Sequence, residues 1–164
     1  MKKLLLSFTI LLTSFSSYSS DFAGGSITWE CLPTGKYIFY MEAFQTCSGP
    51  AWTYQTEVID VVASSMPTNG VIAIVVLPDS NRWNNSGTGD LSQQCSPLLG
   101  TAYSCANGDD GAVQAYYYIS APIALMGVPP QDGWKFYWEG GARDTSIKNV
   151  NVVGTGLLRS IMYP

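Results

Sequence analysis

The chain has 164 residues, with 8 Lys and Arg against 12 Asp and Glu, and no histidine. This acidic balance disfavours nucleic-acid binding, which needs a basic face to meet phosphates. The absence of histidine excludes Ser-His-Asp and Cys-His catalysis, and with them every zinc, copper or iron site that has a histidine ligand.

Residues 1–20 have the order of a secretory signal peptide. Lys2 and Lys3 form a positive start, Leu4–Leu12 is a short apolar run, and small residues follow around Ser17–Ser19. The apolar run is too short to cross a bilayer, which needs about 20 residues. We therefore expect a secreted protein, extracellular or on the cell surface, and a periplasmic location is also compatible with the signal.

Residues 21–164 are expected to form a single domain that does not span a membrane. Six basic and twelve acidic residues remain in it, a net charge of −6. About 145 residues are enough to enclose one hydrophobic core. The abrupt end at Tyr163-Pro164 is compatible with the N-terminal module of a longer protein and equally with a natural terminus.

Apolar residues alternate along most of the mature chain, which predicts β-strands. Ile27–Cys31 and Tyr37–Phe44 flank the turn at Pro33–Gly35 and predict a hairpin. Thr53–Ala63 alternates next. Val71–Leu77 is continuously apolar and β-branched, which is typical of a central strand buried on both faces.

The second half of the chain continues the pattern after two segments expected to be loops, Pro78–Gly89 and Cys95–Asp110. Further strands are expected at Ala112–Ser120, Trp134–Glu139, Ile147–Gly154 and Leu157–Met162. No segment has a convincing helical period. The sequence therefore predicts an all-β fold, an antiparallel β-sandwich that is Ig-like in general architecture, with about seven or eight strands and long loops.

Four cysteines follow the signal peptide: Cys31, Cys47, Cys95 and Cys105. An even number in an exported chain predicts two disulfides. Four thiols allow three pairings, and we favour Cys31–Cys47 with Cys95–Cys105 because each bond closes a short loop between neighbouring segments. A zinc site is disfavoured, because the chain has neither histidine nor a Cys-x-x-Cys spacing.

Asp109 and Asp110 are the candidate metal ligands. They lie in the loop Asn107–Gly111, where adjacent carboxylates and backbone carbonyls would suit calcium. Asp-Asp-Gly is also an ordinary turn sequence, and we weigh the turn above the calcium site. No other cofactor is expected.

Two tryptophans in loop-like, polar surroundings are the candidate binding residues: Trp83, with its neighbours Arg82 and Asn84, and Trp52. An exposed ring could stack on a sugar or anchor a partner protein, whereas the alternative is a plug over one end of the sandwich. The remaining tryptophans alternate with polar residues on strands and are expected in the core: Trp29, Trp134 and Trp138.

Two stretches resemble a β-rich domain at the N-terminus of large Bacteroidetes-type cell-surface proteins. The opening pattern Gly-Gly-x-Ile-x-Tyr-x-Cys is similar to Gly24–Leu32, followed by Gly35, Tyr37 and Cys47. A late strand and the Arg-Asn…Ile-x-Asn-Ile segment after it are similar to Gly133–Trp138, Arg143 and Ile147–Val150. The resemblance spans about residues 22–153.

This chain departs from that family at three places. Gln45-Thr46 stand where Arg-Asp usually precedes the second cysteine, and Gly141-Ala142 replace a pair of adjacent cysteines. Family members typically continue into further repeats and a C-terminal sorting domain, and we find neither pattern within residues 21–164. The resemblance implies an extracellular module with a structural or adhesive role, associated with gliding motility and type IX secretion, and it supplies no catalytic residues.

We therefore expect a noncatalytic structural or adhesion module of the cell surface, whose partners are other surface proteins or glycans. The first alternative is a carbohydrate-binding module that uses Trp83, Trp52 or the face formed by Tyr116–Tyr118. A third reading is a small carboxylate-dependent hydrolase. That chemistry would need two carboxyl groups about 5–10 Å apart in a cleft, from the candidates Glu30, Glu42, Glu57, Asp60 and Glu139.

Overall fold

The computed structural model describes residues 22–49, 52–53, 55–62, 72–82, 87–92, 104–108, 111–125, 130–142 and 155–162. These residues form eight strands and one short 3-10 helix: β1 (Phe22–Cys31), β2 (Tyr37–Thr46), β3 (Glu57–Val62), β4 (Ile72–Pro78), β5 (Thr88–Asp90), η1 (Cys105–Asn107), β6 (Val113–Ser120), β7 (Trp134–Ala142) and β8 (Thr155–Met162). The prediction of an all-β fold is confirmed. In the part of the chain that the structure describes, no helix has the length and apolar character needed to span a membrane.

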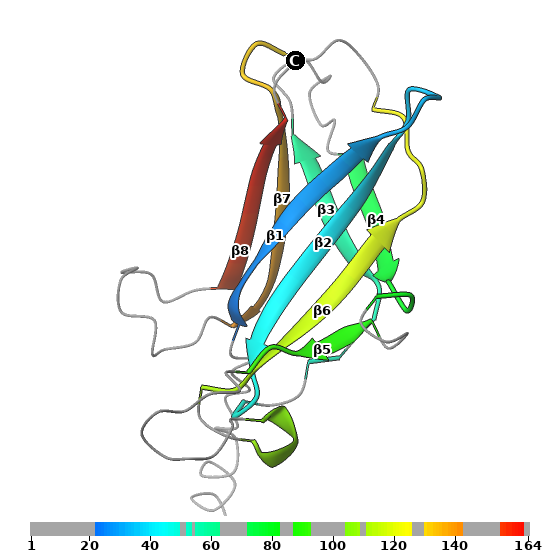
Figure 1. The fold of residues 1–164 in the computed structure, drawn as a ribbon. Helices are drawn as coiled ribbons and strands as arrows, with labels where there is room; N and C mark the ends of the chain where they lie inside the picture. Colours follow the sequence, from blue (N-terminus) through cyan, green and yellow to red (C-terminus); the bar gives the residue numbers. More distant parts are fainter. Residues whose placement is uncertain are drawn as a thin grey trace, which may run out of the picture.

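All eight strands belong to one antiparallel sheet. Its hydrogen-bonded order is β1-β2-β6-β4-β3-β7-β8, and the short β5 pairs with β6 beyond the end of β4. The sheet folds over on itself, so that β1, β2 and β6 lie in front of β3, β4 and β7 (Figure 1). The result is a sandwich of two layers that is nearly a closed barrel, consistent with the predicted architecture.

The two end strands of the sheet, β1 and β8, lie close together and run in the same direction, but they are not joined by a β-ladder (Figure 1). Gly25 of β1 accommodates both neighbours, because a Cβ atom there would clash with the carbonyl oxygen of Glu42 on β2 and lie 2.9 Å from Cδ1 of Leu158 on β8. An apolar side chain therefore closes the seam between the two layers where backbone hydrogen bonds do not.

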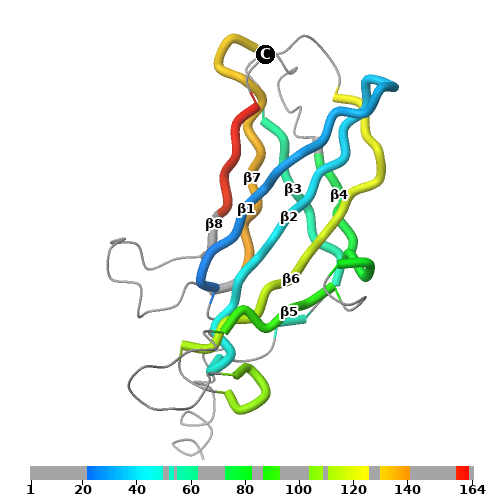
Figure 2. Tube along the Cα trace, viewed as in Figure 1, coloured from blue at the N-terminus to red at the C-terminus, as the bar shows by residue number. Residues whose placement is uncertain are grey.

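The predicted hairpin of β1 and β2 is confirmed. Ile27 pairs with Met41 and Trp29 pairs with Phe39, and Ile27, Phe39 and Met41 are buried in the interior. Figure 2 traces both strands from their turn near the top of the view down to the opposite end of the molecule. Alternation along an extended chain places every second side chain on the same face.

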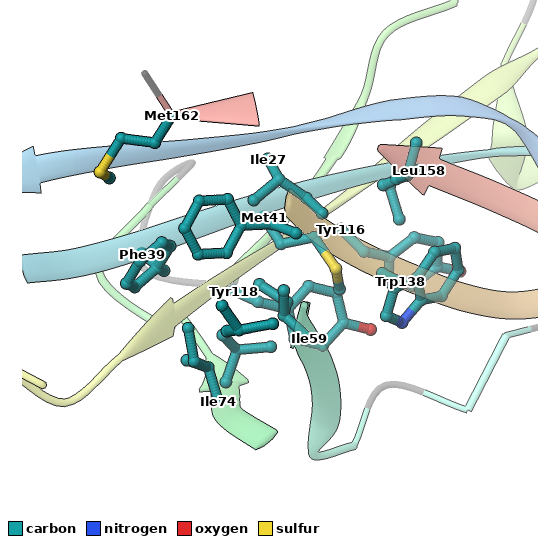
Figure 3. Packing of buried hydrophobic residues seen from close by; sticks show 14 of the residues in the cluster. Ile27, Phe39, Met41, Ile59, Ile74, Tyr116, Tyr118, Trp138, Leu158 and Met162 are labelled. Carbon is teal, nitrogen blue, oxygen red and sulfur yellow. The ribbon is translucent and has the colours of Figure 1, made fainter. Parts of the chain in front are cut away.

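Large aromatic and aliphatic side chains fill the space between the layers (Figure 3). Phe39 of β2 meets Phe136 of β7 with ring centroids 4.8 Å apart, and Trp29 of β1 meets the same ring at 5.6 Å. Trp134 and Trp138 are buried, as predicted. Burial of each such side chain contributes about 2–3 kcal/mol, which makes this cluster the main source of stability.

The prediction for Val71–Leu77 is wrong in one respect. The segment does form a central strand, β4, between β6 and β3. Its inner residues Ile74 and Val76 are buried, but Val75 and Leu77 are 52% and 53% exposed. A continuous apolar run is typical of a strand covered on both sides, and here the outer side is not covered.

One further segment differs from its prediction, and another lies outside the residues that the structure describes. Part of the segment expected to be a loop, Pro78–Gly89, belongs to β5, a strand of three residues that is too short to show a period. The expected strand Ile147–Gly154 lies outside the described residues, whereas Leu157–Met162 is confirmed as most of β8.

Candidate functional site

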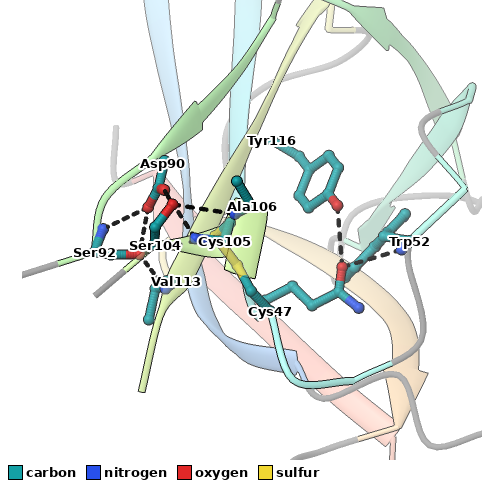
Figure 4. Close-up of a disulfide and its surroundings, with 10 residues drawn as sticks. Cys47, Trp52, Asp90, Ser92, Ser104, Cys105, Ala106, Val113 and Tyr116 are labelled. Atoms are coloured by element: carbon teal, nitrogen blue, oxygen red, sulfur yellow. Dashed lines mark hydrogen bonds between the residues drawn. A yellow bond between two sulfur atoms is a disulfide. The ribbon is translucent and has the colours of Figure 1, made fainter. Parts of the chain in front are cut away.

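One disulfide joins Cys47, directly after β2, to Cys105, the first residue of η1 (Figure 4). The two residues are 58 positions apart in the sequence. The predicted pairings Cys31–Cys47 and Cys95–Cys105 are therefore wrong. Cys95 itself lies outside the described residues.

The hairpin explains why Cys31 cannot reach Cys47. Cys31 pairs with Tyr37 at the turn, whereas Cys47 follows the last residue of the ten-residue strand β2. At about 3.3 Å per residue, the two cysteines lie roughly 30 Å apart. Cys31 is an exposed thiol without a disulfide partner.

Asp90 organises the backbone around the disulfide (Figure 4). Its Oδ1 accepts hydrogen bonds from the backbone N–H of Ser92 at 2.9 Å and from the Ser92 hydroxyl. Its Oδ2 accepts from the backbone N–H of Cys105 at 2.9 Å and from the Ser104 hydroxyl at 3.4 Å. The carboxylate thus ties the end of β5 to the start of η1.

The Ser92 side chain continues this network. Its oxygen accepts a hydrogen bond of 3.1 Å from the backbone N–H of Val113, the first residue of β6, and lies 3.8 Å from the sulfur of Cys105. Partial burial alone would raise the pKa of Asp90, but the hydrogen bonds from Ser92, Cys105 and Ser104 outweigh it and hold the pKa below its ordinary value. We call the region formed by Cys47, Asp90, Ser92 and η1, together with Trp52, the disulfide end.

Trp52 is packed at the disulfide end and is only partly exposed. Its ring stacks on Trp138 with centroids 5.4 Å apart and an interplanar angle of 18°, and it lies 6.1 Å from Phe22. The buried Gln45 fixes its backbone, because Gln45 Oε1 accepts hydrogen bonds of 3.1 Å from the N–H of Trp52 and from the hydroxyl of Tyr116. Trp52 therefore occupies the position of a plug over one end of the sandwich.

The aromatic residues Tyr116–Tyr118 do not form one face. Tyr116 and Tyr118 are buried, and burial raises the pKa of the Tyr116 hydroxyl. Tyr117 points to the outer side, where the guanidinium of Arg82 lies 5.5 Å from its ring centroid. Burial also raises the pKa of Tyr117.

Arg82 stands where the chain leaves for the predicted binding loop. Its exposed guanidinium lies 3.9 Å from Asp79, and its carbonyl accepts a hydrogen bond of 3.0 Å from the N–H of Gly87. Trp83 and Asn84 lie between these two ends, outside the described residues. Their predicted binding role stays a prediction.

The metal candidates lie outside the described residues, and two of the carboxylate candidates have hydrogen-bond partners within them. Asp109 and Asp110 lie outside them, and no group of three or more possible ligands occurs among the residues that the structure describes. Glu30 accepts a hydrogen bond of 3.1 Å from the Tyr40 hydroxyl, and Glu57 accepts one of 3.1 Å from Nε1 of the Trp138 indole. These two carboxylates thus have local partners on different strands.

The outer side of β3 and β4 is the most unusual surface of the described structure. Val58, Val62, Val75 and Leu77 all point outward and are between 41% and 53% exposed. Val58 pairs directly with Val75 across the two strands, and Asp60 stands two residues from Val58 and two from Val62. We call these five residues the β3–β4 outer face.

Sequence reasoning did not identify Asp90 or Gln45 as organising residues. Asp90 had a local signal, because Asp-x-Ser favours a turn in which the carboxylate accepts from the backbone two residues on. Gln45 had none, since its two donors come from residues 7 and 71 positions away.

A scan against protein-family models found no match to this chain, and searches of curated proteins and of solved structures likewise found none. The site must therefore be interpreted from its own geometry.

Proposed function

We propose that this chain is a noncatalytic module exported to the cell surface, where it has a structural or adhesive role. The observation that carries the proposal is the β3–β4 outer face. Four aliphatic side chains there remain roughly half exposed, and contiguous apolar surface of this kind often marks an interaction site on a soluble protein.

The disulfide supports the compartment. A bond between Cys47 and Cys105 indicates an oxidising environment outside the cytoplasm. Residues 1–20, with their signal-peptide pattern, lie outside the described residues, and export through them is part of the proposal. The resemblance of Gly24–Leu32 to the opening of Bacteroidetes-type surface domains supports the same location.

The chemistry of the described side chains supports a noncatalytic role. The chain has no histidine. Asp90 accepts hydrogen bonds from Ser92, Ser104 and Cys105, which hold η1 against the end of β5, and the Ser92 hydroxyl links this group to β6. The interior between the layers is filled by aromatic and aliphatic side chains.

Glycan recognition is a second candidate, and one observation favours it. Arg82 stacks over the outward ring of Tyr117 and flanks the segment that carries Trp83, an arrangement of cation and ring that suits sugars with a negative charge. The rings of Trp52, Tyr116 and Tyr118 instead pack against other side chains of the domain. An Arg82→Ala variant should then lose binding on a glycan array, whereas Val75→Glu should not.

The test of the first proposal is export followed by attachment. The whole chain is expressed with and without residues 1–20 in a bacterium with an outer membrane, and intact cells are labelled with a reagent that does not cross membranes. We expect labelling only when residues 1–20 are present. Beads coated with the protein should then adhere to cells, and Val75→Glu should reduce adhesion. Retention in the cytoplasm, or adhesion unchanged by Val75→Glu, would contradict the proposal.

A further inference from the structure

The outer side of β2 and β6 carries two tyrosine rings next to a carboxylate. Glu42 of β2 pairs directly with Tyr117 of β6, and Tyr40 stands two residues before Glu42 on the same side of β2. Side chains that pair directly across antiparallel strands have Cβ atoms about 5 Å apart. All three residues are partly exposed. The two rings and the carboxylate therefore form one accessible surface.

Two further acids and one base border this surface. The Tyr40 hydroxyl donates a hydrogen bond of 3.1 Å to the exposed Glu30 of β1. The guanidinium of Arg82 lies 5.5 Å from the centroid of the Tyr117 ring, and its Nε lies 3.9 Å from the Asp79 carboxylate. Partial burial raises the pKa of Tyr40, the hydrogen bond to Glu30 raises it further, and the charges of Arg82 and Asp79 also act on it. We call the following residues the tyrosine face: Glu30, Tyr40, Glu42, Asp79, Arg82 and Tyr117.

The tyrosine face has an excess of negative charge. It contains three acids and one base, a net charge of −2. Asp79 has Arg82 as an ion-pair partner. Among the described residues, no ion pair involves Glu30 or Glu42. A carboxylate beside an aromatic ring attracts cations, because the face of the ring is also negative.

Arg82 shows which chemical group this surface accepts. It comes from the connection between β4 and β5, and its side chain is 52% exposed, yet its guanidinium lies over the ring of Tyr117. A planar guanidinium stacks on an aromatic ring while its edge donates hydrogen bonds to a carboxylate. The ring of Tyr40 and the carboxylate of Glu42 offer the same chemistry a second time. Among the described residues, no basic side chain lies over the Tyr40 ring.

We propose that the tyrosine face binds a basic segment of a partner polypeptide, with an arginine of the partner over Tyr40 and against Glu42. Charge complementarity decides for this partner. An anionic glycan would meet a surface of net charge −2, and a purely apolar partner would bury the Glu42 carboxylate without a counter-charge, which is costly. The tyrosine face belongs to the layer of β1, β2 and β6, so this inference goes beyond the proposed role of the β3–β4 outer face.

The test is calorimetric titration of the mature protein, with its disulfide intact, with a short peptide of alternating arginine and glycine. At ~50 mM salt exposed charges are only weakly screened, and we expect binding that weakens at least threefold when the salt is raised to ~500 mM. Glu42→Gln should weaken binding about fivefold, the upper end of the range for an exposed ion pair. Tyr40→Leu should weaken it about threefold, because the ring is lost while the apolar bulk is kept.

Glu139→Gln is the matched control. It removes the same charge by the same substitution at an exposed position of β7, in the other layer, and it should leave the Kd unchanged. A peptide with glutamate in place of arginine should not bind. Circular dichroism of every variant verifies that the fold is retained. No binding of the arginine peptide, or equal weakening by Glu42→Gln and Glu139→Gln, would overturn the inference.

Arg82→Ala separates this inference from glycan recognition, because the two predict changes of opposite sign. The substitution removes a competing positive charge and uncovers the ring of Tyr117, so the arginine peptide should bind about threefold more tightly. A site for anionic sugars would instead lose its cation. If the anionic polysaccharide heparin binds the wild type but not Arg82→Ala, while the arginine peptide binds neither, the inference is refuted and glycan recognition is supported. Adhesion that depends on Val75 is a separate measurement on the other surface, so its outcome and this one can fail independently.

Discussion

The disulfide end and the β3–β4 outer face differ in how their side chains are used. At the disulfide end, a covalent bond, the carboxylate of Asp90 and the stacked ring of Trp52 all act within the domain. On the outer face, Val75 and Leu77 have no such internal role, although they are as apolar as the core. The first region therefore holds the fold together, whereas the second is available to a partner.

Of the changes considered, removal of the disulfide should lower the free energy of unfolding most. Cys47→Ser combined with Cys105→Ser releases a loop of 58 residues, and the chain-entropy model gives a loss of about 4 kcal/mol for that length. Urea denaturation measures it. Cys31→Ser should change stability by less than about 0.5 kcal/mol because the residue is exposed. Peptide mapping without reduction should recover Cys47 linked to Cys105, and a Cys31–Cys47 peptide would contradict the structure.

Truncation of Trp52 should have the second-largest effect on stability. Trp52→Ala removes its stacking on Trp138 and its contact with Phe22, and the partly exposed ring should cost about 2 kcal/mol, less than a fully buried tryptophan. Trp52→Phe keeps an aromatic ring in the plug and should cost less than half as much. Thermal unfolding followed by circular dichroism compares the two. If Trp52→Ala were as stable as the wild type, Trp52 would not contribute to the stability of the disulfide end.

Asp90 should make stability depend on acid pH. Its folded-state pKa is lower than its ordinary value, so the ionised carboxylate stabilises the fold above about pH 4 and this contribution disappears as the pH falls through the folded-state pKa. Asp90→Asn should cost about 1 kcal/mol near neutrality, in line with the loss of a capping carboxylate. Urea midpoints from pH 7 to pH 3 should then fall less steeply for Asp90→Asn than for the wild type. Parallel curves would refute this role.

The smallest effect is expected on the outer face. Val75→Ala should change the stability of the monomer by less than about 0.5 kcal/mol, because its side chain does not contact the core. Val76→Ala, the same substitution on the inner side of the same strand, should cost about 2 kcal/mol through a lost contact and a cavity. Denaturation of dilute protein separates the two. A large loss at Val75 would show that this face serves the fold.

Local pattern accounts for much of what the sequence predicted. Alternation identified the hairpin and the core roles of Trp134 and Trp138, because a strand with one buried face carries its orientation in every second residue. For Trp52, the sequence allowed two interpretations, an exposed binding ring or a plug over one end of the sandwich. Local pattern could not choose between them, since the deciding ring belongs to Trp138, far along the chain.

The candidate site was less predictable than the fold. The β3–β4 outer face depends on which strands receive a covering layer, and an apolar run such as Val71–Leu77 has the same pattern whether its outer side is buried or exposed. The role of Gln45 depends on a contact with Tyr116, 71 residues later.

The sequence by itself determined the strand-forming periodicity, the acidic charge, the lack of histidine chemistry and the inward side of most strands, since each of these is a property of neighbouring residues. Only the tertiary structure decided that Cys47 meets Cys105, and that Val75 and Leu77 face outward. Both depend on how the sheet folds over on itself. That arrangement is set by contacts between segments many residues apart, which no local period can record.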